Sequence, residues 1–498
     1  MSERGTDSLP SGSGLPSRAG LQPVHIALFG LAALTLFRFW YCTWVELVPD
    51  EGYYWIWSKH LAASYRDKGP GIAWAIALGT RVFGDTVLGI RVVGVLLSAG
   101  TGWELYRLAR RLYDERTALW CLLVALIMPL FAVGAILMTI DSLSVFFWAW
   151  AMNLLWSALD TGKMRYWAVL GLAIGLGFLA KFTNGIQLVC IAMFLLWSKP
   201  HRHFLFSGQT VAMLGAFGIC SLPILIWNLE TGWVHAQALH SRSGAEGAFM
   251  VRPLELLRFL GEHAGVVSPL LMIGIVVAAI GLARNQPRDL RVRFLLCQFV
   301  PLYALFTFFS LNHAGKPNWP APALVAGILL FVVFWRDLTA RRPPWRWAVY
   351  LTLGLALLIT IVLHLAALFP ILPQRVNPMR RAQGWPSFAE HVQQVRRQTG
   401  IGLLLGDHYA QASMMRFYLP DHPITYLPDA PYGSSQFTLW PSYDLKPGTQ
   451  ALYVTDNMGP LPRKLEEEFG ESRLLDDFWS VYRGRASIHF RIYRLTHH

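Results

Sequence analysis

The stretch VHIALFGLAALTLFRFWYCTWV, Val24 to Val45, is apolar along almost its whole length. The segment after it, ELVPDEGYYWIWSKH, places the acids Asp50 and Glu51 among aromatic side chains. An apolar run of about 20 residues can cross a bilayer as a helix. This run is too long for a signal peptide, and no small-residue cleavage site follows it. We therefore expect a retained membrane helix that ends shortly before the acid pair.

The rest of the chain repeats this apolar pattern. Of its 498 residues, 54% are hydrophobic and only 15% are charged, whereas soluble domains contain about 25% charged residues. The expected fold is an α-helical multi-pass membrane protein with about eleven transmembrane helices. The candidate spans are residues 24–46, 86–108, 117–134, 142–158, 167–180, 184–198, 209–228, 264–284, 294–311, 319–335 and 347–369. The pair at 167–198 could instead be one helix and a re-entrant segment.

Basic residues indicate the orientation of the chain. The formal net charge is +13, but many of the Lys and Arg residues gather in five short loops: RLARRLYDER, TGKMR, SKPHRH, RNQPRDLRVR and WRDLTARRPPWR. These are alternate loops between apolar runs, and such a bias marks the cytoplasmic side of a membrane. The charge therefore reports topology and does not predict nucleic-acid binding. With a cytoplasmic N-terminus, an odd number of spans puts the C-terminal end outside.

Three regions differ in composition. Residues 1–22 are rich in Ser, Gly and Pro and are predicted to be disordered. Residues 23–370 form the membrane module, and residues 371–498 form a small α/β domain. In that domain IGLLLGDHYAQASMMRFYL indicates a strand, a turn and an amphipathic helix, TQALYVTDN and ASIHFRIYRL indicate strands, and LPRKLEEEFG indicates a helix. It contains no GxGxxG, P-loop or Gly-x-Ser-x-Gly motif. The five cysteines all lie in apolar runs, which predicts neither a disulfide framework nor a thiolate metal site.

On this topology the unusual polar residues share one face of the membrane. The first outside loop spans about residues 47–85, and a later one spans 229–263. Short outside segments surround Asp141, Lys181 and His313. This convergence predicts a functional site on the outer face.

Asp50 is a candidate carboxylate base, and its neighbours Glu51, Tyr53 and Tyr54 are candidates for substrate binding. In a partly apolar pocket, desolvation raises the pKa of a carboxylate towards the working pH. Aromatic faces also suit sugar rings. The alternative is an interfacial belt of aromatic residues with solvated acids.

The segment YRDKGPGIAW places Arg66, Asp67 and Lys68 before a Gly-Pro-Gly bend. Lys68 and Arg66 are candidates to hold an anionic phosphate, and Asp67 is a candidate ligand of a divalent cation. An oxygen ligand suits magnesium or manganese, and a histidine such as His240 or His235 would permit zinc. Alternatively, the bend only turns a loop into an interfacial helix, and both histidines are ordinary loop residues.

Three further polar sites interrupt apolar sequence. An acid such as Asp141, in AILMTIDSLSVFFW, is costly in a membrane and usually pairs or functions, although it could simply cap the next helix. Lys181, in FLAKFTNG, is either a phosphate contact or a lysine that extends to the membrane surface. His313, Lys316 and Asn318 lie in LNHAGKPNWPAP, where proline and glycine indicate broken helix ends that can direct backbone groups to a ligand.

Together these motifs resemble the bacterial polyprenyl-phosphate-dependent GT-C glycosyltransferases, which include lipid A aminoarabinose transferases and are related to the protein O-mannosyltransferases. The resemblance covers about residues 24–370 and rests on VPDEGYYWIWSKHLAASYRDKGPGIAW, GDTVLGIRVVGVLLSAGTGWELYRLARRLYDERTALW, MTIDSLSVFFWAW, LAKFTNG and KPNWPAP. It implies a module in the bacterial inner membrane with a cavity at its periplasmic face, capped by a periplasmic α/β domain. The implied donor is a sugar on undecaprenyl phosphate or a similar polyprenol. The implied acceptor is lipid A, lipopolysaccharide core, another glycan or a protein.

The resemblance also implies roles for residues. Asp50 matches the family's first acid, a general base or acceptor-aligning group, and Asp141 matches the second. Asp67 and Lys68 match an acidic–basic pair implied in metal and phosphate contact. Many relatives read Asp-His-Pro-Pro where this chain reads Asp-Lys-Gly-Pro, which leaves a metal open. Lys181 matches a basic residue that faces the lipid phosphate, Lys316 is a further implied contact of the donor phosphate, and His313 is an implied substrate contact.

The expected reaction is sugar transfer with inversion at the anomeric carbon. An acceptor hydroxyl attacks as the C1–O–phosphate bond breaks, Asp50 takes or orients its proton, and lysines offset the charge of the departing phosphate. The alternative is a transporter or flippase of a lipid-linked or anionic solute, because charged residues in membrane segments also mark transport paths. The polar residues gather at one face without a clear inverted repeat, which argues against that alternative.

Overall fold

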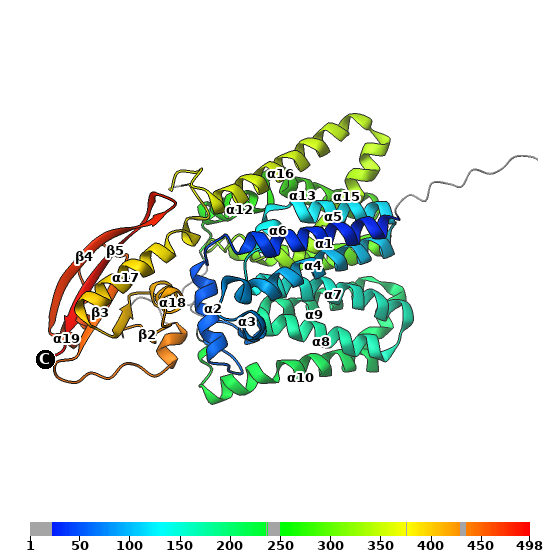
Figure 1. Ribbon diagram of the computed structural model, residues 1–498. Helices are drawn as coiled ribbons and strands as arrows, with labels where there is room; N and C mark the ends of the chain where they lie inside the picture. The colour runs from blue at the N-terminus through cyan, green and yellow to red at the C-terminus, as the bar shows by residue number, and fades with distance from the viewer. Residues whose placement is uncertain (1–21, 236, 238–249, 375, 429–434) are drawn as a thin grey trace, which may run out of the picture.

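The computed structural model describes residues 22–235, 237, 250–374, 376–428 and 435–498. One part is a bundle of helices, from α1 to α16, and the other is a five-stranded sheet with its own helices (Figure 1). The sheet lies at one end of the bundle, and α2 and α18 lie between the two parts. The expected disorder of residues 1–22 falls, apart from Gln22, outside the described residues.

The described helices of the bundle are α1 (Pro23–Cys42), α2 (Pro49–Lys59), α3 (Gly71–Phe83), α4 (Val87–Leu112), α5 (Glu115–Ile127), α6 (Pro129–Gly134), α7 (Ile140–Thr161), α8 (Met164–Ala180), α9 (Ile186–Trp197), α10 (Gly208–Glu230), α12 (Pro253–Val267), α13 (Pro269–Asn285), α14 (Leu290–Phe309), α15 (Leu324–Arg341) and α16 (Arg346–Leu368). Within the described ranges, seven helical stretches are long and apolar enough to cross a membrane. The bent pair α12–α13 would make an eighth. The prediction of a multi-pass helical membrane protein is confirmed at this level.

Two of the expected spans are divided by proline. The span expected at 117–134 breaks between α5 and α6, where Met128 is extended before Pro129, as residues before proline prefer. The span expected at 264–284 begins only at Pro269. The residue before it, Ser268, has a φ of 86°, and α12 meets α13 there at a bend of 103°.

Residues 167–198 form the pair of short helices, α8 and α9, that was one of the two expected alternatives. A short 3₁₀ segment, η1 (Phe182–Gly185), separates them. The far end of α9 reaches the start of α14, where Arg293 donates a hydrogen bond to the carbonyl of Trp197 at 3.2 Å. Lys181 therefore lies at the turn of a helical hairpin.

The five basic loops meet at one end of the bundle. Arg111 at the end of α4 pairs with Asp160 at the end of α7, at 2.8 Å. Arg336 of α15 pairs with Asp114, also at 2.8 Å. Arg291 at the start of α14 donates to the carbonyl of Leu112. These contacts, together with that of Arg293, link the ends of α4, α7, α9, α14 and α15, as the charge pattern predicts.

The described elements of the C-terminal part, called the sheet region below, are α17 (Trp385–Thr399), β1 (Leu403–Gly406), α18 (Tyr409–Tyr418), β2 (Thr425–Tyr426), β3 (Gln450–Thr455), α19 (Arg463–Phe469), β4 (Glu471–Tyr482) and β5 (Arg485–Thr496). The strand order is β2-β1-β3-β5-β4. Strand β1 pairs parallel with β2 and β3, and β5 pairs antiparallel with β3 and β4. The predicted small α/β unit is confirmed, and α17 and β4 are elements that the sequence patterns did not indicate.

The sheet region is attached to the bundle through α2 and the residues before it. Glu46 accepts hydrogen bonds from the backbone N–H groups of Gly384 and Trp385, at 2.7 and 3.0 Å. Helices α2 and α18 touch, because a Cβ added to Gly52 would lie 2.9 Å from the Met414 sulfur. One apolar core runs from α2 and α3 into α17, α18 and the sheet. The two parts therefore form a continuous unit around α2.

Candidate active site

The two acids in the first turn of α2, Asp50 and Glu51, make contacts with different parts of the protein. Glu51 is fully buried and forms an ion pair with Arg91 of α4, with N–O distances of 2.5 and 2.7 Å. The same carboxylate accepts the backbone N–H groups of Val48 and Met138, and Arg91 donates to the carbonyl of Cys42. The expectation that Glu51 binds substrate is therefore not supported. Its carboxylate instead joins the ends of α1 and α2 to α4 and to the segment before α7.

Asp50 lies on the side of α2 that meets the sheet region. Tyr409, the first residue of α18, donates its hydroxyl to Asp50 Oδ1 at 2.7 Å. The Tyr409 ring also stacks on the ring of Tyr53, with centroids 4.6 Å apart. Burial, followed by the charge of Asp50, raises the pKa of Tyr409 above its usual range, so this phenol stays a neutral donor. The sheet region thus supplies a hydrogen bond to the predicted base.

Asp141, in the first turn of α7, forms an ion pair with Lys181. The Lys181 Nζ lies 2.7 Å from one carboxylate oxygen, and the two side chains are only 17% and 8% exposed. Asn318 donates its amide to the other oxygen at 2.5 Å, and Lys181 Nζ lies 3.4 Å from the carbonyl of Trp319. The alternative in which Asp141 merely caps α7 is not supported, because Thr139 occupies the cap position.

Gly69 explains how the loop with Asp67 and Lys68 approaches Lys181. A Cβ on Gly69 would lie 2.1 Å from the carbonyl oxygen of Leu179, two residues before Lys181. Such a distance excludes any side chain, so only glycine permits this backbone contact. Lys68 and Lys181 therefore belong to segments that touch. Lysines on two touching segments are candidates to hold an anionic phosphate.

Gln436 of the sheet region contacts the same loop. The Tyr53 hydroxyl donates to Asp67 Oδ2 at 3.4 Å and accepts the backbone N–H of Gln436 at 2.5 Å. The side-chain oxygen of Gln436 accepts the backbone N–H of Arg66 at 2.7 Å. The Arg66 Nε is buried and makes no hydrogen bond within the described part of the chain.

Tyr54 lies near all three predicted acids: Asp50, Asp141 and Asp67. Burial, followed by the charges of these carboxylates and of Tyr409, raises the pKa of Tyr54 well above its usual value. A phenol that stays protonated can donate a hydrogen bond to a substrate oxygen. Tyr54 is therefore a neutral donor near the predicted acids.

The weaker candidates lie away from this group. His313 and Lys316 are both exposed, and Asn318 from the same loop is the residue that reaches Asp141. His240, the candidate metal ligand, lies outside the described residues. Its neighbour in sequence His235 is buried, with Nδ1 2.9 Å from the carbonyl oxygen of Tyr65.

The described carboxylates and histidines do not gather around a metal position. Among residues 22–235, 237, 250–374, 376–428 and 435–498, no three His, Cys, Asp or Glu side chains lie together as a metal-binding group. The donor set therefore does not fit a resident ion held by these side chains alone. Magnesium can be held by one or two carboxylates and completed by substrate phosphates and water, and Asp67 beside Lys68 is where such an ion is expected.

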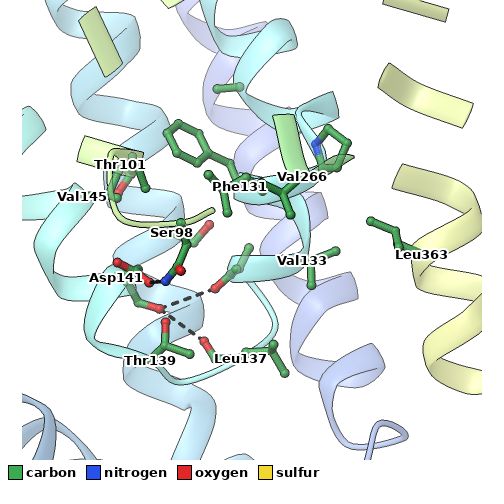
Figure 2. Close-up of a pocket in the computed structure, with 18 of the residues that line it drawn as sticks. Ser98, Thr101, Phe131, Val133, Leu137, Thr139, Asp141, Val145, Val266 and Leu363 are labelled. Carbon is green, nitrogen blue, oxygen red and sulfur yellow. Dashed lines mark hydrogen bonds between the residues drawn. The ribbon is translucent and has the colours of Figure 1, made fainter. Parts of the chain in front are cut away.

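A cavity of about 260 Å³ opens inside the bundle beside Asp141 (Figure 2). Most of its lining is apolar and comes from several helices, including Val133 of α6, Val145 of α7 and Leu363 of α16. Asn318, which holds Asp141, also lines it. Asp141, the acid of the pair with Lys181, therefore borders a mostly apolar space.

Comparisons with known proteins show similarity in sequence to glycosyltransferases. Residues 67–227 match the family model described as dolichyl-phosphate-mannose-protein mannosyltransferase. The chain is 31% identical over 339 residues to the undecaprenyl phosphate-alpha-4-amino-4-deoxy-L-arabinose arabinosyl transferase of Pseudomonas aeruginosa, covering 62% of this chain and 57% of that protein. It thus spans little more than half the length of that relative. It is also 26% identical over 395 residues to the lipid A galacturonosyltransferase RgtD of Rhizobium johnstonii, covering 78% of this chain and 81% of that protein.

Solved structures extend the similarity to the whole fold. The crystal structure of ArnT from Cupriavidus metallidurans in the apo state matches with a TM-score of 0.61 at 16% identity, over 95% of this chain and 98% of that chain. The structure of ArnT from the same organism bound to undecaprenyl phosphate matches with the same TM-score at 17% identity, over 93% and 97% of the two chains. This chain is therefore similar in sequence to an undecaprenyl-phosphate-dependent arabinosyl transferase and to a lipid A galacturonosyltransferase, and its fold is similar to that of ArnT.

Proposed function

We propose that the chain is a membrane glycosyltransferase. It moves a sugar from undecaprenyl phosphate, or a similar polyprenyl phosphate, to an acceptor of the bacterial cell envelope such as lipid A. The observation that carries this proposal is the ion pair of Asp141 with Lys181, at a mostly apolar cavity that Asp141 lines, with the segment of Lys68 packed against that of Lys181. The relatives named above, an undecaprenyl-phosphate-dependent arabinosyl transferase and a lipid A galacturonosyltransferase, support the same donor and acceptor classes.

The arrangement of side chains suggests a division of work. Asp50 takes or orients the acceptor proton, and because Tyr409 occupies Oδ1, the acceptor meets Oδ2. Lys181 and Lys68 stabilise the phosphate as the C1–O bond breaks and the anomeric carbon inverts. Asp141 acts through Lys181: together with Asn318 it fixes where the ammonium group, and hence the phosphate, is held. If a divalent ion is bound, Asp67 and the substrate phosphate are its expected ligands.

We further propose the topology of the chain. All eleven apolar segments, including the short helices α8 and α9, cross the inner membrane, the N-terminus is cytoplasmic and the sheet region is periplasmic. The support is the clustering of the five basic loops at the end of the bundle opposite α2, since cytoplasmic loops carry the excess of Lys and Arg. Protease added to spheroplasts should then cleave the sheet region and leave the basic loops intact.

Transfer of labelled sugar tests the function directly. The purified chain is placed in vesicles with a labelled sugar on undecaprenyl phosphate and with lipid A, without any ion gradient. The proposal expects label on lipid A, and an arm with a chelator shows whether a divalent ion takes part. Label that crosses the bilayer still attached to undecaprenyl phosphate would instead support a transporter.

Lys181→Ala is expected to weaken use of the donor. A hydrogen bond to a charged group contributes about 1.5–3 kcal/mol, so the KM for the lipid-linked sugar should rise about 10–100-fold. Initial rates at varied donor concentration measure this change. Lys163→Ala, which removes an exposed lysine at the basic end of the bundle, is the matched control and should change the KM less than about twofold. If Lys181→Ala has the same KM for the donor as wild type, Lys181 does not contact the donor phosphate and serves only as the partner of Asp141.

Tyr409→Phe is expected to lower the kcat of transfer. The variant keeps the ring that stacks on Tyr53 and loses only the hydroxyl that donates to Asp50. A hydrogen bond to a charged group contributes about 1.5–3 kcal/mol, so loss of this positioning contact should lower kcat about tenfold or more. Tyr426→Phe, a control in β2 of the same sheet, should leave kcat within about twofold of wild type. A wild-type kcat in Tyr409→Phe would show that the hydroxyl does not position the base.

A further inference from the structure

Arg38 of α1 is a buried cation within a membrane-spanning helix. Only 4% of the surface of Arg38 is exposed. It lies four residues before the end of α1 at Cys42, which is about 6 Å below that end. A charged side chain at such depth is costly, and it usually faces a partner, a cavity or a ligand.

The partners of Arg38 inside the protein are few. Its Nη1 donates to the Ser98 hydroxyl of α4 at 3.1 Å. That is the one hydrogen bond of its guanidinium to the described residues, and none of their carboxylates pairs with it. Arg91, also on α4, shows the contrast: its guanidinium is satisfied by Glu51 and by three backbone carbonyls. A guanidinium has five N–H donors, so most of those on Arg38 are available to a ligand.

The space in front of Arg38 is the cavity that also reaches Asp141. Arg38, Ser98 and Asp141 all line it. In Figure 2, Ser98 and Asp141 lie on one side of this cavity, and Val133 and Leu363 lie on the other. The side with Val133 and Leu363 is an apolar wall. The other side carries the Asp141 carboxylate, whose charge Lys181 offsets, and Arg38 is a cation in the same lining.

The cavity lies next to the outer helices of the bundle. Arg38 comes from α1 and Leu363 from α16, whose most apolar windows are only 22% and 33% buried inside the protein. Beside Arg38 on α1, Phe37 and Trp40 are 45% and 58% exposed, as expected of a surface that faces lipid tails. Helices α1 and α16 therefore contribute both to the lining of the cavity and to the exposed apolar surface of the bundle.

We propose that this cavity binds the phosphate group of a membrane lipid, with Arg38 as its cationic contact and the apolar wall against the lipid chains. Arginine suits this role because its planar guanidinium can hold a phosphate through two parallel hydrogen bonds. Charge complementarity supports an anion, since the cation has no carboxylate partner among the described residues. The proposal rests on the proposed function in one respect: it places a lipid substrate beside Asp141. The phosphate can belong to the donor, undecaprenyl phosphate, or to the acceptor, lipid A.

Lipid binding to the full chain in detergent tests this site without any sugar transfer. Native mass spectrometry compares undecaprenyl phosphate with undecaprenol, and lipid A with its dephosphorylated form. Arg38→Gln is expected to weaken binding of one phosphorylated lipid about tenfold or more and to leave its phosphate-free counterpart within about twofold. If lipid A binds more weakly, the phosphate that Arg38 contacts belongs to the acceptor. If undecaprenyl phosphate binds more weakly, that phosphate belongs to the donor. Because no catalysis is measured, the result is independent of whether the transfer assay succeeds.

Three variants keep the test decisive. Arg38→Lys retains the charge and should keep most of the binding. Arg258→Gln removes an arginine of α12 whose side chain is 66% exposed, and it should behave as wild type. If Arg38→Gln does not fold, Leu363→Trp fills the cavity from α16 and should weaken the same lipid. The proposal is overturned if the folded variant binds both phosphorylated lipids as tightly as wild type, or if the wild type does not distinguish them from their phosphate-free forms.

Discussion

Replacing Asp50 with Asn is expected to leave the protein folded and inserted in the membrane while lowering the rate of sugar transfer by about 10²–10⁴-fold, the contribution typical of a positioned proton-transfer group. Asparagine keeps the size of the side chain and can still accept the Tyr409 hydroxyl through its carbonyl oxygen. It cannot take a proton from the acceptor. The loss should therefore appear in kcat, measured with labelled donor at saturating acceptor.

Asp85→Asn is the matched control for this experiment. Asp85 lies between α3 and α4, accepts a hydrogen bond from Trp55 and pairs with Lys59 of α2, with both side chains of that pair about one third exposed. The substitution is chemically identical but removes only a surface ion pair, which contributes little. Near-normal kcat in Asp50→Asn would remove Asp50 from the role of base, whatever the control shows.

Glu51→Gln is expected to lower stability by about 3–5 kcal/mol, the loss found when one partner of a buried ion pair is removed. The neighbouring acid is thus predicted to affect folding rather than chemistry. The variant leaves the Arg91 guanidinium charged and enclosed, with no carboxylate beside it. Denaturant unfolding of the purified chain in detergent measures the change.

Two comparisons separate this effect from general damage. Glu262→Gln breaks an ion pair with Arg258 in which both side chains are more than 40% exposed, and it should hardly alter unfolding. The double variant Glu51→Leu with Arg91→Leu removes both charges, so its cost should be smaller than the sum of the two single costs. If Glu51→Gln is as stable as Glu262→Gln, the pair does not hold α2 in place.

The sequence predicts those parts of the site whose signal is local. Asp141 and Lys181 are isolated charges in apolar runs, and that isolation is visible in the amino-acid sequence alone. Asn318 is visible only as a member of a polar cluster, because nothing local tells it apart from His313 or Lys316. Arg91 lies inside an expected span, and its role could not be predicted because its partner Glu51 lies 40 residues earlier in the sequence.

Contacts between distant segments could not be predicted in this way. Tyr409 is 359 residues from Asp50, and its segment indicates only a strand, a turn and a helix. The same limit applies to fold elements whose pattern is weak. Strand β4 is mostly exposed along its first half, so it lacks the alternation of apolar and polar residues that marks a half-buried strand.

The hydrogen bond from Tyr409 to Asp50 has a consequence for how such chains can be recombined. If the sheet region of one relative were exchanged for that of another, the membrane module would keep its own acids and lysines. It would nevertheless receive a new neighbour for its base, together with a new surface against α2. Chimaeras joined near residue 370 would therefore change the hydrogen-bond partner of the catalytic acid as well as the surface that covers it. A functional chimaera should therefore exchange the sheet region together with the α2 surface that it touches. The same two surfaces are expected to change together in evolution.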